Sequence, residues 1–215
     1  MKEQKRMKYY NLSSNIIACD NYLPQQVVEN IYTDFLNNRE TFNVPNWSFP
    51  NSPIEKKEFF SSRCGGFDFW IAWDEIAQKK LFIESLSHWF FHDGFFSYAS
   101  LNDNNKSFKL MKRKIEWDIH VICYNNGGYY NWHEDLGVKN LFTFNLILNK
   151  GNKLKGGDMF FMDDNKIIKV KNKNNFMVVF PSFIPHCISP LYTENNEDAS
   201  FLEQRFSLQF WVRLA

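Results

Sequence analysis

Three side chains that can bind a metal stand out in the sequence. His133 and Asp135 are separated by one residue, and His186 follows much later in the chain. On an extended segment, side chains two residues apart point to the same side, so His133 and Asp135 can reach one ion. Two imidazoles and one carboxylate form the facial triad that holds non-haem Fe(II) and leaves the opposite positions open. The spacing therefore predicts a redox-active iron site.

A segment of alternating polar and apolar residues that begins at Arg205 is a second candidate for a binding site. From position 205 the chain alternates polar and apolar residues, which predicts a strand with two different faces. The apolar face is typical of a core, whereas the other carries Arg205, Ser207, Gln209 and Trp211. Such a polar face suits a pocket in which a guanidinium grips a carboxylate through two hydrogen bonds. An edge strand with its polar face in water is the alternative.

The elements that must position these residues begin with a helical part. A short strand is predicted at 16–23 and ends at Pro24, and apolar residues then recur at helical spacing. Residues 41–53, which contain Pro45 and Pro50, read as an extended loop. A second helix is predicted to start at Asp74, because aspartate is a favoured helix cap.

From about residue 110 the hydrophobic period changes to two. Strands are predicted at 115–124, 141–148, 158–162, 166–171, 175–180, 186–191 and 205–213. Helices followed by many short strands predict an α+β, mainly β, fold, namely a double-stranded β-helix (jelly roll) with N-terminal supporting helices. We expect one domain over 1–215, in which 1–109 supply helical support and substrate-side insertions and 110–215 form the jelly-roll core.

Composition narrows the classes of function and compartment. The chain has 215 residues and a net charge of +1, which does not favour a dominant nucleic-acid or membrane partner. No apolar run approaches the roughly 20 residues that span a bilayer. The four cysteines show no CxxC spacing, which is typical of free thiols in a reducing compartment. We therefore expect a cytoplasmic protein.

A series of motifs runs through most of the chain. They are Ile16–Pro24, Tyr124-x-x-Gly127-x-x-Tyr130-x-x-His133-x-Asp135, Leu148-Asn149, Gly156-Gly157-Asp158, Pro181, His186, Ser189-Pro190-Leu191 and Arg205–Trp211. Together these motifs resemble the 2-oxoglutarate/Fe(II)-dependent dioxygenases, and specifically their prolyl 4-hydroxylase-like branch. The polar stretch 193–198 lengthens the spacing between the last histidine and the arginine, and we interpret it as an inserted loop.

The resemblance implies a set of cofactors and the residues that bind them. It implies that His133, Asp135 and His186 bind Fe(II) and that Arg205 holds the distal carboxylate of the cosubstrate 2-oxoglutarate. It further implies O2 as a substrate, ascorbate as a stimulant, and three residues around the cosubstrate: Tyr124, Thr143 and Trp211. An aspartate at position 135, where related halogenases have a smaller residue, favours hydroxylation.

The implied reaction is hydroxylation of an unactivated C–H bond with release of succinate and CO2. The resemblance favours a prolyl or other residue of a peptide or protein as substrate. A free amino acid or a small metabolite is the alternative. Tyr129, Tyr130 and Trp132 are candidates for the substrate rim, together with the region 41–73, although packing aromatics would look the same.

Three other classes of function fit the sequence less well. His133-Glu134 starts like the zinc-binding HExxH motif, but position 137 is glycine, so a zinc hydrolase is not indicated. A non-catalytic jelly-roll binding module would require the triad to be vestigial. Nucleic-acid binding would rest on a basic stretch that aspartates interrupt, namely Lys150, Lys153, Lys155, Lys166, Lys169, Lys171 and Lys173. We therefore consider a nucleic-acid partner unfavourable.

Overall fold

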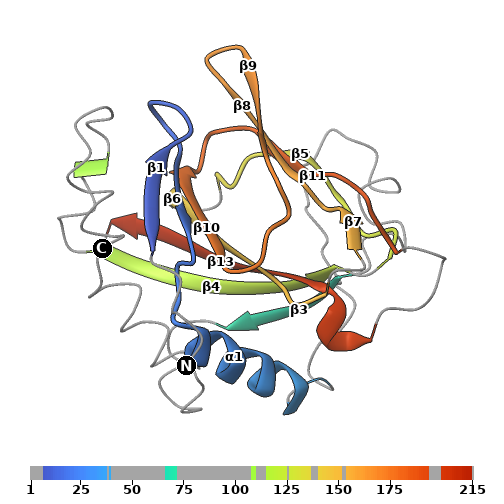
Figure 1. The fold of residues 1–215 in the computed structure, drawn as a ribbon. Coiled ribbons are helices and arrows are strands. Elements are labelled where there is room, and N and C mark those ends of the chain that lie inside the picture. Colours follow the sequence, from blue (N-terminus) through green and yellow to red (C-terminus); the bar gives the residue numbers. More distant parts are fainter. Residues whose placement is uncertain are drawn as a thin grey trace.

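The computed structural model of the protein describes residues 7–37, 39, 66–71, 108–109, 115–124, 126–136, 140–151, 154–193 and 200–214. Over these residues the chain forms two antiparallel sheets that face each other, with helix α1 (Gln25–Asn37) packed on the outer side of the larger sheet (Figure 1). This is the double-stranded β-helix that the sequence predicts. No helix within the described ranges is long and apolar enough to span a membrane.

The larger sheet has seven strands in the order β1-β2-β10-β6-β13-β4-β3. Their bounds are Lys8–Asn11 (β1), Ile17–Asp20 (β2), Phe176–Pro181 (β10), Asn140–Asn149 (β6), Arg205–Leu214 (β13), Ile115–Tyr124 (β4) and Gly66–Ile71 (β3). Strand β13 lies between β6 and β4, so that Arg205 pairs with Tyr124 on one side and with Asn149 on the other. The last strand of the chain is therefore central in the sheet.

The smaller sheet has four strands in the order β5-β11-β8-β9. Their bounds are Tyr130–His133 (β5), His186–Ile188 (β11), Met159–Asp163 (β8) and Lys166–Val170 (β9). A separate two-stranded ladder joins β12 (Leu191–Thr193) to β7 (Leu154–Gly156), and a short 3-10 helix, η4 (Phe201–Glu203), leads into β13. The β8–β9 hairpin extends beyond the rest of the sheet (Figure 1).

Two hydrophobic layers hold these elements together. The outer layer lies between α1 and the larger sheet, and it takes one face of β13, where Phe206, Leu208 and Phe210 are fully buried. The inner layer lies between the two sheets and contains Phe161 and Phe180. Because side chains alternate along a strand, the opposite face of β13 points into the space between the sheets. Its residues Arg205, Ser207 and Gln209 are buried there, so the alternative of a strand face in water is wrong.

Helix α1 forms where apolar residues recur at helical spacing. Its buried residues are Val28, Ile31, Tyr32 and Phe35. The carbonyl of Pro24 accepts the first helical hydrogen bonds, from the backbone N–H groups of Val27 and Val28 at 3.0 and 3.1 Å. Proline suits this position because it has no N–H that an earlier turn would need to satisfy.

Several boundaries differ from those that the sequence predicts. Strand β2 ends at Asp20, because Asn21 has a positive φ of 51° and turns the chain before Pro24. The predicted strand at 186–191 is two strands, β11 and β12, which Ser189 and Pro190 separate. Strands β1, β3, β5 and β7 were not predicted. The second helix expected from Asp74, the loop at 41–53, and all of the inserted loop at 193–198 except Thr193, which ends β12, lie outside the described residues.

Candidate metal centre

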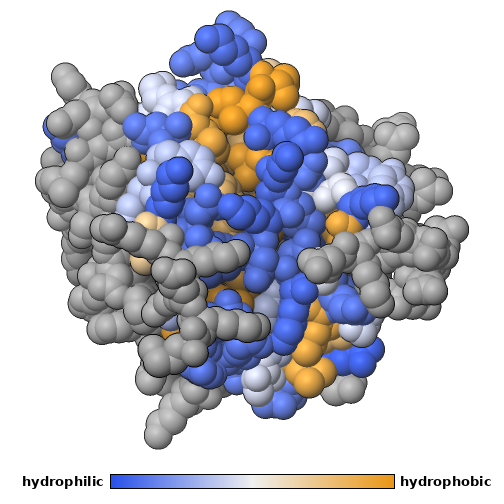
Figure 2. All heavy atoms as spheres, viewed as in Figure 1, coloured by the Kyte–Doolittle hydropathy of each residue, from blue (hydrophilic) through white to orange (hydrophobic). Residues whose placement is uncertain are grey.

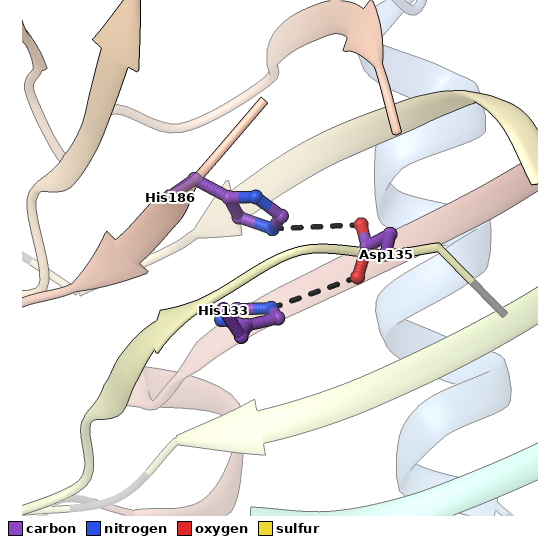
Figure 3. Close-up of side chains that lie close together, drawn as sticks. All are labelled: His133, Asp135 and His186. Carbon is purple, nitrogen blue, oxygen red and sulfur yellow. Dashed lines mark ion pairs between the residues drawn. The ribbon is translucent and has the colours of Figure 1, made fainter. Parts of the chain in front are cut away.

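His133 and His186 are brought together by the pairing of two short strands. In the β5–β11 ladder these two residues are direct partners, and their ring centres are 4.1 Å apart. Asp135 follows two residues after β5 ends, and its side chain turns back toward both imidazoles (Figure 3). The Nε2 atoms of His133 and His186 lie 3.6 and 3.4 Å from the two carboxylate oxygens of Asp135.

This cluster has the geometry of a metal site. One possible ligand atom from each of the three residues lies within 4.8 Å of the other two, and Asp135 and His186 are buried. Nε2 of His186 is a buried nitrogen to which no other described residue offers a hydrogen bond. A buried polar atom without a partner is costly unless something else satisfies it. The three donors therefore fit a divalent ion that accepts nitrogen and oxygen ligands.

The protonation of both histidines leaves Nε2 available. Nδ1 of His133 lies 2.7 Å from the carbonyl oxygen of Asn131, and Nδ1 of His186 lies 2.9 Å from that of Ile184. A carbonyl can only accept, so Nδ1 carries the proton in each neutral ring and Nε2 carries a lone pair. Burial, and then the nearby His186, lower the pKa of His133 from 6.5 to about 3. His133 is therefore neutral at physiological pH.

Asp135 is held at three points. Its backbone N–H donates to the carbonyl of Ser182 at 2.9 Å, and its own carbonyl accepts from the Asn140 side chain at 3.1 Å. The hydroxyl of Thr143 donates to Oδ2 of the carboxylate at 2.7 Å. The family resemblance implies that Thr143 lies beside the cosubstrate, and in the structure its hydroxyl contacts the carboxylate of Asp135. Its place on β6 gave no sign of this contact, which depends on tertiary packing.

Arg205 is the largest fully buried side chain in the described part of the chain. Its Nε donates to the carbonyl oxygen of Gly157 at 3.1 Å, and its guanidinium carbon lies 5.0 Å from the ring centre of Tyr124. Burial lowers the pKa of Arg205, but a guanidinium remains protonated in proteins. Its two terminal nitrogens, Nη1 and Nη2, are buried and find no hydrogen-bond partner among the described residues. They form a ready fork for a carboxylate.

The Gly156-Gly157 motif shapes the wall behind this arginine. Gly156 has φ +76°, and a Cβ there would lie 2.1 Å from the carbonyl oxygen of Pro190. Gly157 has φ +65°, and a Cβ there would meet the side chains of Leu191 and Arg205 at 2.9 and 3.0 Å. Only glycine tolerates both the conformation and the close approach. The motif therefore lets the Gly157 carbonyl reach Nε of Arg205.

The other predicted cosubstrate and rim residues lie on the same two sheets, except Tyr129, which directly precedes β5. Tyr124 is buried on β4, and Trp211 pairs with Thr143 across β13 and β6. Tyr129 and Tyr130 are half-buried, and the Tyr130 ring centre is 4.0 Å from that of His133. Trp132 remains 42% exposed.

Two exposed apolar side chains near the ligands were not predicted. Leu136 follows Asp135 directly and is 56% exposed, and Phe183 lies three residues before His186 and is 55% exposed. The sequence marks both only as apolar residues one to three positions from a proposed ligand, in segments without strand periodicity. Their exposure makes them candidates for contact with a substrate.

Three of the seven lysines of the basic stretch form ion pairs with carboxylates of the protein itself. Lys150 pairs with Glu29 at 2.8 Å and Lys169 with Asp158 at 2.7 Å, and Lys173 pairs with Asp20. Among the residues that Figure 2 colours by hydropathy, most on this face are hydrophilic, and hydrophobic ones gather near the top and again at the lower right. These pairs leave less positive charge for a phosphate backbone than the lysine count implies.

Comparisons with known proteins agree with the fold and the site. Residues 119–213 match the model of the 2OG-Fe(II) oxygenase superfamily, and no curated protein sequence matches the chain. The fold is similar to a Trichoplax adhaerens prolyl hydroxylase solved with a hypoxia inducible factor peptide fragment (18% identity, TM-score 0.60, covering 94% of this chain and 84% of that one). It is also similar to a Pseudomonas putida prolyl-4-hydroxylase (16% identity, TM-score 0.59, covering 94% and 93%).

A third similar structure is the viral collagen prolyl hydroxylase of Paramecium bursaria Chlorella virus-1 in complex with 2OG (15% identity, TM-score 0.50, covering 94% and 97%). At these identities the likeness extends to the fold, while the family match covers most of the strands that surround the His–Asp–His cluster. Residues 119–213 therefore contain a 2OG-Fe(II) oxygenase domain, the fold is prolyl 4-hydroxylase-like, and the protein is an iron dioxygenase that uses 2-oxoglutarate.

Proposed function

We propose that the protein hydroxylates an unactivated C–H bond of a residue in a peptide or protein, prolyl residues first, and releases succinate and CO2. His133, Asp135 and His186 bind the iron, and Arg205 binds the distal carboxylate of 2-oxoglutarate. The observation that carries this proposal is a cluster of three possible ligands, two of them buried, together with one buried guanidinium whose terminal nitrogens have no hydrogen-bond partner among the described residues.

Each residue has a defined task in this proposal. Iron together with 2-oxoglutarate supplies the chemistry that activates O2 and oxidises a C–H bond. His133 and His186 present neutral Nε2 atoms, and Asp135 supplies negative charge that partly neutralises the divalent ion. Arg205 fixes the orientation of 2-oxoglutarate by pairing with its far end. The inner hydrophobic layer, including Phe161 and Phe180, packs against His186 and keeps water from this side of the site.

The peptide substrate is supported by two observations. The solved structures to which the fold is similar include prolyl hydroxylases, one of them solved with a peptide fragment. Trp132, Leu136 and Phe183 lie within three residues of a proposed ligand in the sequence and stay exposed, and exposed apolar side chains are suited to bind a partner. A free amino acid or small metabolite is the competing substrate class.

The iron and cosubstrate assignment is tested without turnover. Adding Fe(II) and then 2-oxoglutarate to the protein in the absence of oxygen should give a weak visible absorption band. The band should be lost in Asp135→Ala and should need higher 2-oxoglutarate concentrations in Arg205→Lys. A band of full strength in Asp135→Ala would contradict the ligand set.

The substrate class is tested by succinate formation. Peptides that contain proline, matched peptides with alanine in its place, and free amino acids are compared as stimulants of 2-oxoglutarate decarboxylation. We expect the proline peptides to stimulate it, with hydroxylated product seen as a mass increase of one oxygen. Stimulation by free amino acids alone would replace the peptide proposal with the small-molecule alternative.

A further inference from the structure

We propose that Ser182 and Thr143 form a hydroxyl relay that positions the carboxylate of Asp135 for metal binding. This inference rests on the proposed iron site and adds two positioning residues to it. Oγ1 of Thr143 lies 2.7 Å from Oδ2 of Asp135 and 3.1 Å from Oγ of Ser182. The side chains of Ser182 and Thr143 are fully buried and Asp135 is 8% exposed, so water hardly competes for these bonds.

The direction of the relay follows from the number of protons. An ionised carboxylate can only accept, so the single hydroxyl proton of Thr143 goes to Asp135. Thr143 then has no proton left for Ser182, and Ser182 must donate to the oxygen of Thr143. The chain runs from Ser182 through Thr143 to Asp135. In such a chain each hydrogen bond polarises the next, which strengthens the bond to the carboxylate.

Ser182 also fixes the backbone on which Asp135 sits. Its carbonyl accepts the N–H of Asp135 at 2.9 Å, while its own N–H donates to the carbonyl of Leu141 at 3.0 Å. Ser182 therefore holds Asp135 at two points, directly through the main chain and through Thr143 at the carboxylate. This support matters because residues 134–136 belong to no strand or helix.

The same turn also orients the second histidine. It runs from Ser182 to Pro185, and the carbonyl of Ile184 lies 2.9 Å from Nδ1 of His186. One short turn thus contacts two of the three proposed ligands. Groups that hydrogen-bond to metal ligands set the ligand orientation, and their loss typically lowers metal affinity by about 10–100-fold.

The test compares metal affinity with stability in matched variants. Thr143→Val removes the hydroxyl but keeps the shape, Thr143→Ser restores a hydroxyl, and Ser182→Ala removes the outer donor. Ser13→Ala is the control, because the Ser13 hydroxyl donates to another buried carboxylate, that of Asp163, at 2.5 Å. Mn(II) is titrated into the metal-free proteins without 2-oxoglutarate, and the melting temperature of each metal-free protein is measured.

We expect Thr143→Val to raise the Mn(II) dissociation constant by about 10–100-fold. Thr143→Ser should recover most of the affinity, and Ser182→Ala should lose part of it. Ser13→Ala should lower the melting temperature and leave the dissociation constant at the wild-type value. If Thr143→Val does not fold, Ser182→Ala provides the same comparison, because it leaves Thr143 in contact with Asp135.

Two outcomes would separate the relay from the iron site itself. Wild-type affinity in both Thr143→Val and Ser182→Ala, with metal binding that depends on Asp135, would overturn the relay alone. Absence of Mn(II) binding to the wild-type protein, or equal binding by Asp135→Ala, would overturn the proposed ligand set and the relay with it.

Discussion

The guanidinium of Arg205 faces the ring of Tyr124, its direct partner in the ladder between β13 and β4, with 5.0 Å between the guanidinium carbon and the ring centre. The aromatic ring covers the cation, and the Gly157 carbonyl accepts a hydrogen bond from its Nε–H. The two terminal nitrogens of Arg205 therefore remain available as hydrogen-bond donors to a ligand. A planar fork held in this way is suited to a carboxylate.

Replacing Arg205 with lysine should therefore weaken 2-oxoglutarate binding selectively. Lysine keeps the charge but has no planar fork, and hydrogen bonds to charged groups contribute about 1.5–3 kcal/mol, which corresponds to a loss of affinity of about 10–100-fold. The measurement is an anaerobic titration of 2-oxoglutarate into the protein loaded with Fe(II). 2-Oxobutyrate, which lacks the second carboxylate, is the control ligand. An equal loss for both ligands would mean that Arg205 does not read the far carboxylate.

Gly157→Ala should displace the side chain of Arg205, because the added methyl group would contact it. The added Cβ would lie 3.0 Å from both Cδ of Arg205 and Nδ2 of Asn172, at a residue with φ +65°. We expect lower stability, by about 1–2 kcal/mol from the backbone conformation, and weaker 2-oxoglutarate binding from displacement of the arginine. Gly127→Ala is the matched control, because Gly127 has φ +80° but nothing within 4 Å of its Cβ position. Equal 2-oxoglutarate affinity in the two variants would argue against displacement.

Trp132→Ala should raise the KM for a peptide substrate without changing metal or 2-oxoglutarate binding. Trp132 is 42% exposed and precedes His133 on β5. Tryptophan residues at binding surfaces often contribute more than 1 kcal/mol, or about fivefold in affinity. Met162→Ala on the β8–β9 hairpin, also exposed, serves as the control. A KM that rises equally in both variants would contradict a specific role for Trp132.

Alkaline pH should destabilise the protein in part through Cys19. Burial raises the pKa of this thiol from 9.0 to about 12. The unfolded chain loses the proton first, so the stability linked to Cys19 is complete below pH 9 and is lost as pH rises toward 12. Urea unfolding across this range should show a falling free energy of unfolding, with a smaller slope in Cys19→Ala. Identical slopes would show that Cys19 does not carry the effect.

The strands whose two faces are both buried were the most predictable from the sequence. The alternation from Arg205 to Val212 predicted β13 and its two faces, because each face has a uniform chemical character. Alternation alone could not decide whether the polar face meets water or a second sheet, since that depends on strands distant in the sequence. Strand β5 was not predicted, because it has four residues and none of them is fully buried.

The site was predictable at the level of residue type and spacing, but its contacts were not. The histidine–x–aspartate pair and the distant histidine could be named, yet their approach depends on the register that pairs His133 with His186. The bond from Thr143 to Asp135 joins a residue on β6 to one eight positions earlier that lies outside the strands, which no periodicity reveals. The hydroxyl of Ser182 lies 39 positions from that of Thr143.

The two histidines belong to the smaller sheet, whereas Arg205 belongs to the larger one. In the binding mode proposed above, 2-oxoglutarate would bridge the gap between these sheets, and the inner hydrophobic layer keeps that gap constant. The thickness of this layer then acts as a ruler for cosubstrate length. Oxaloacetate, one carbon shorter, would reach only one of the two ends, and enlarging or shrinking a core residue such as Phe161 would shift the chain length that fits.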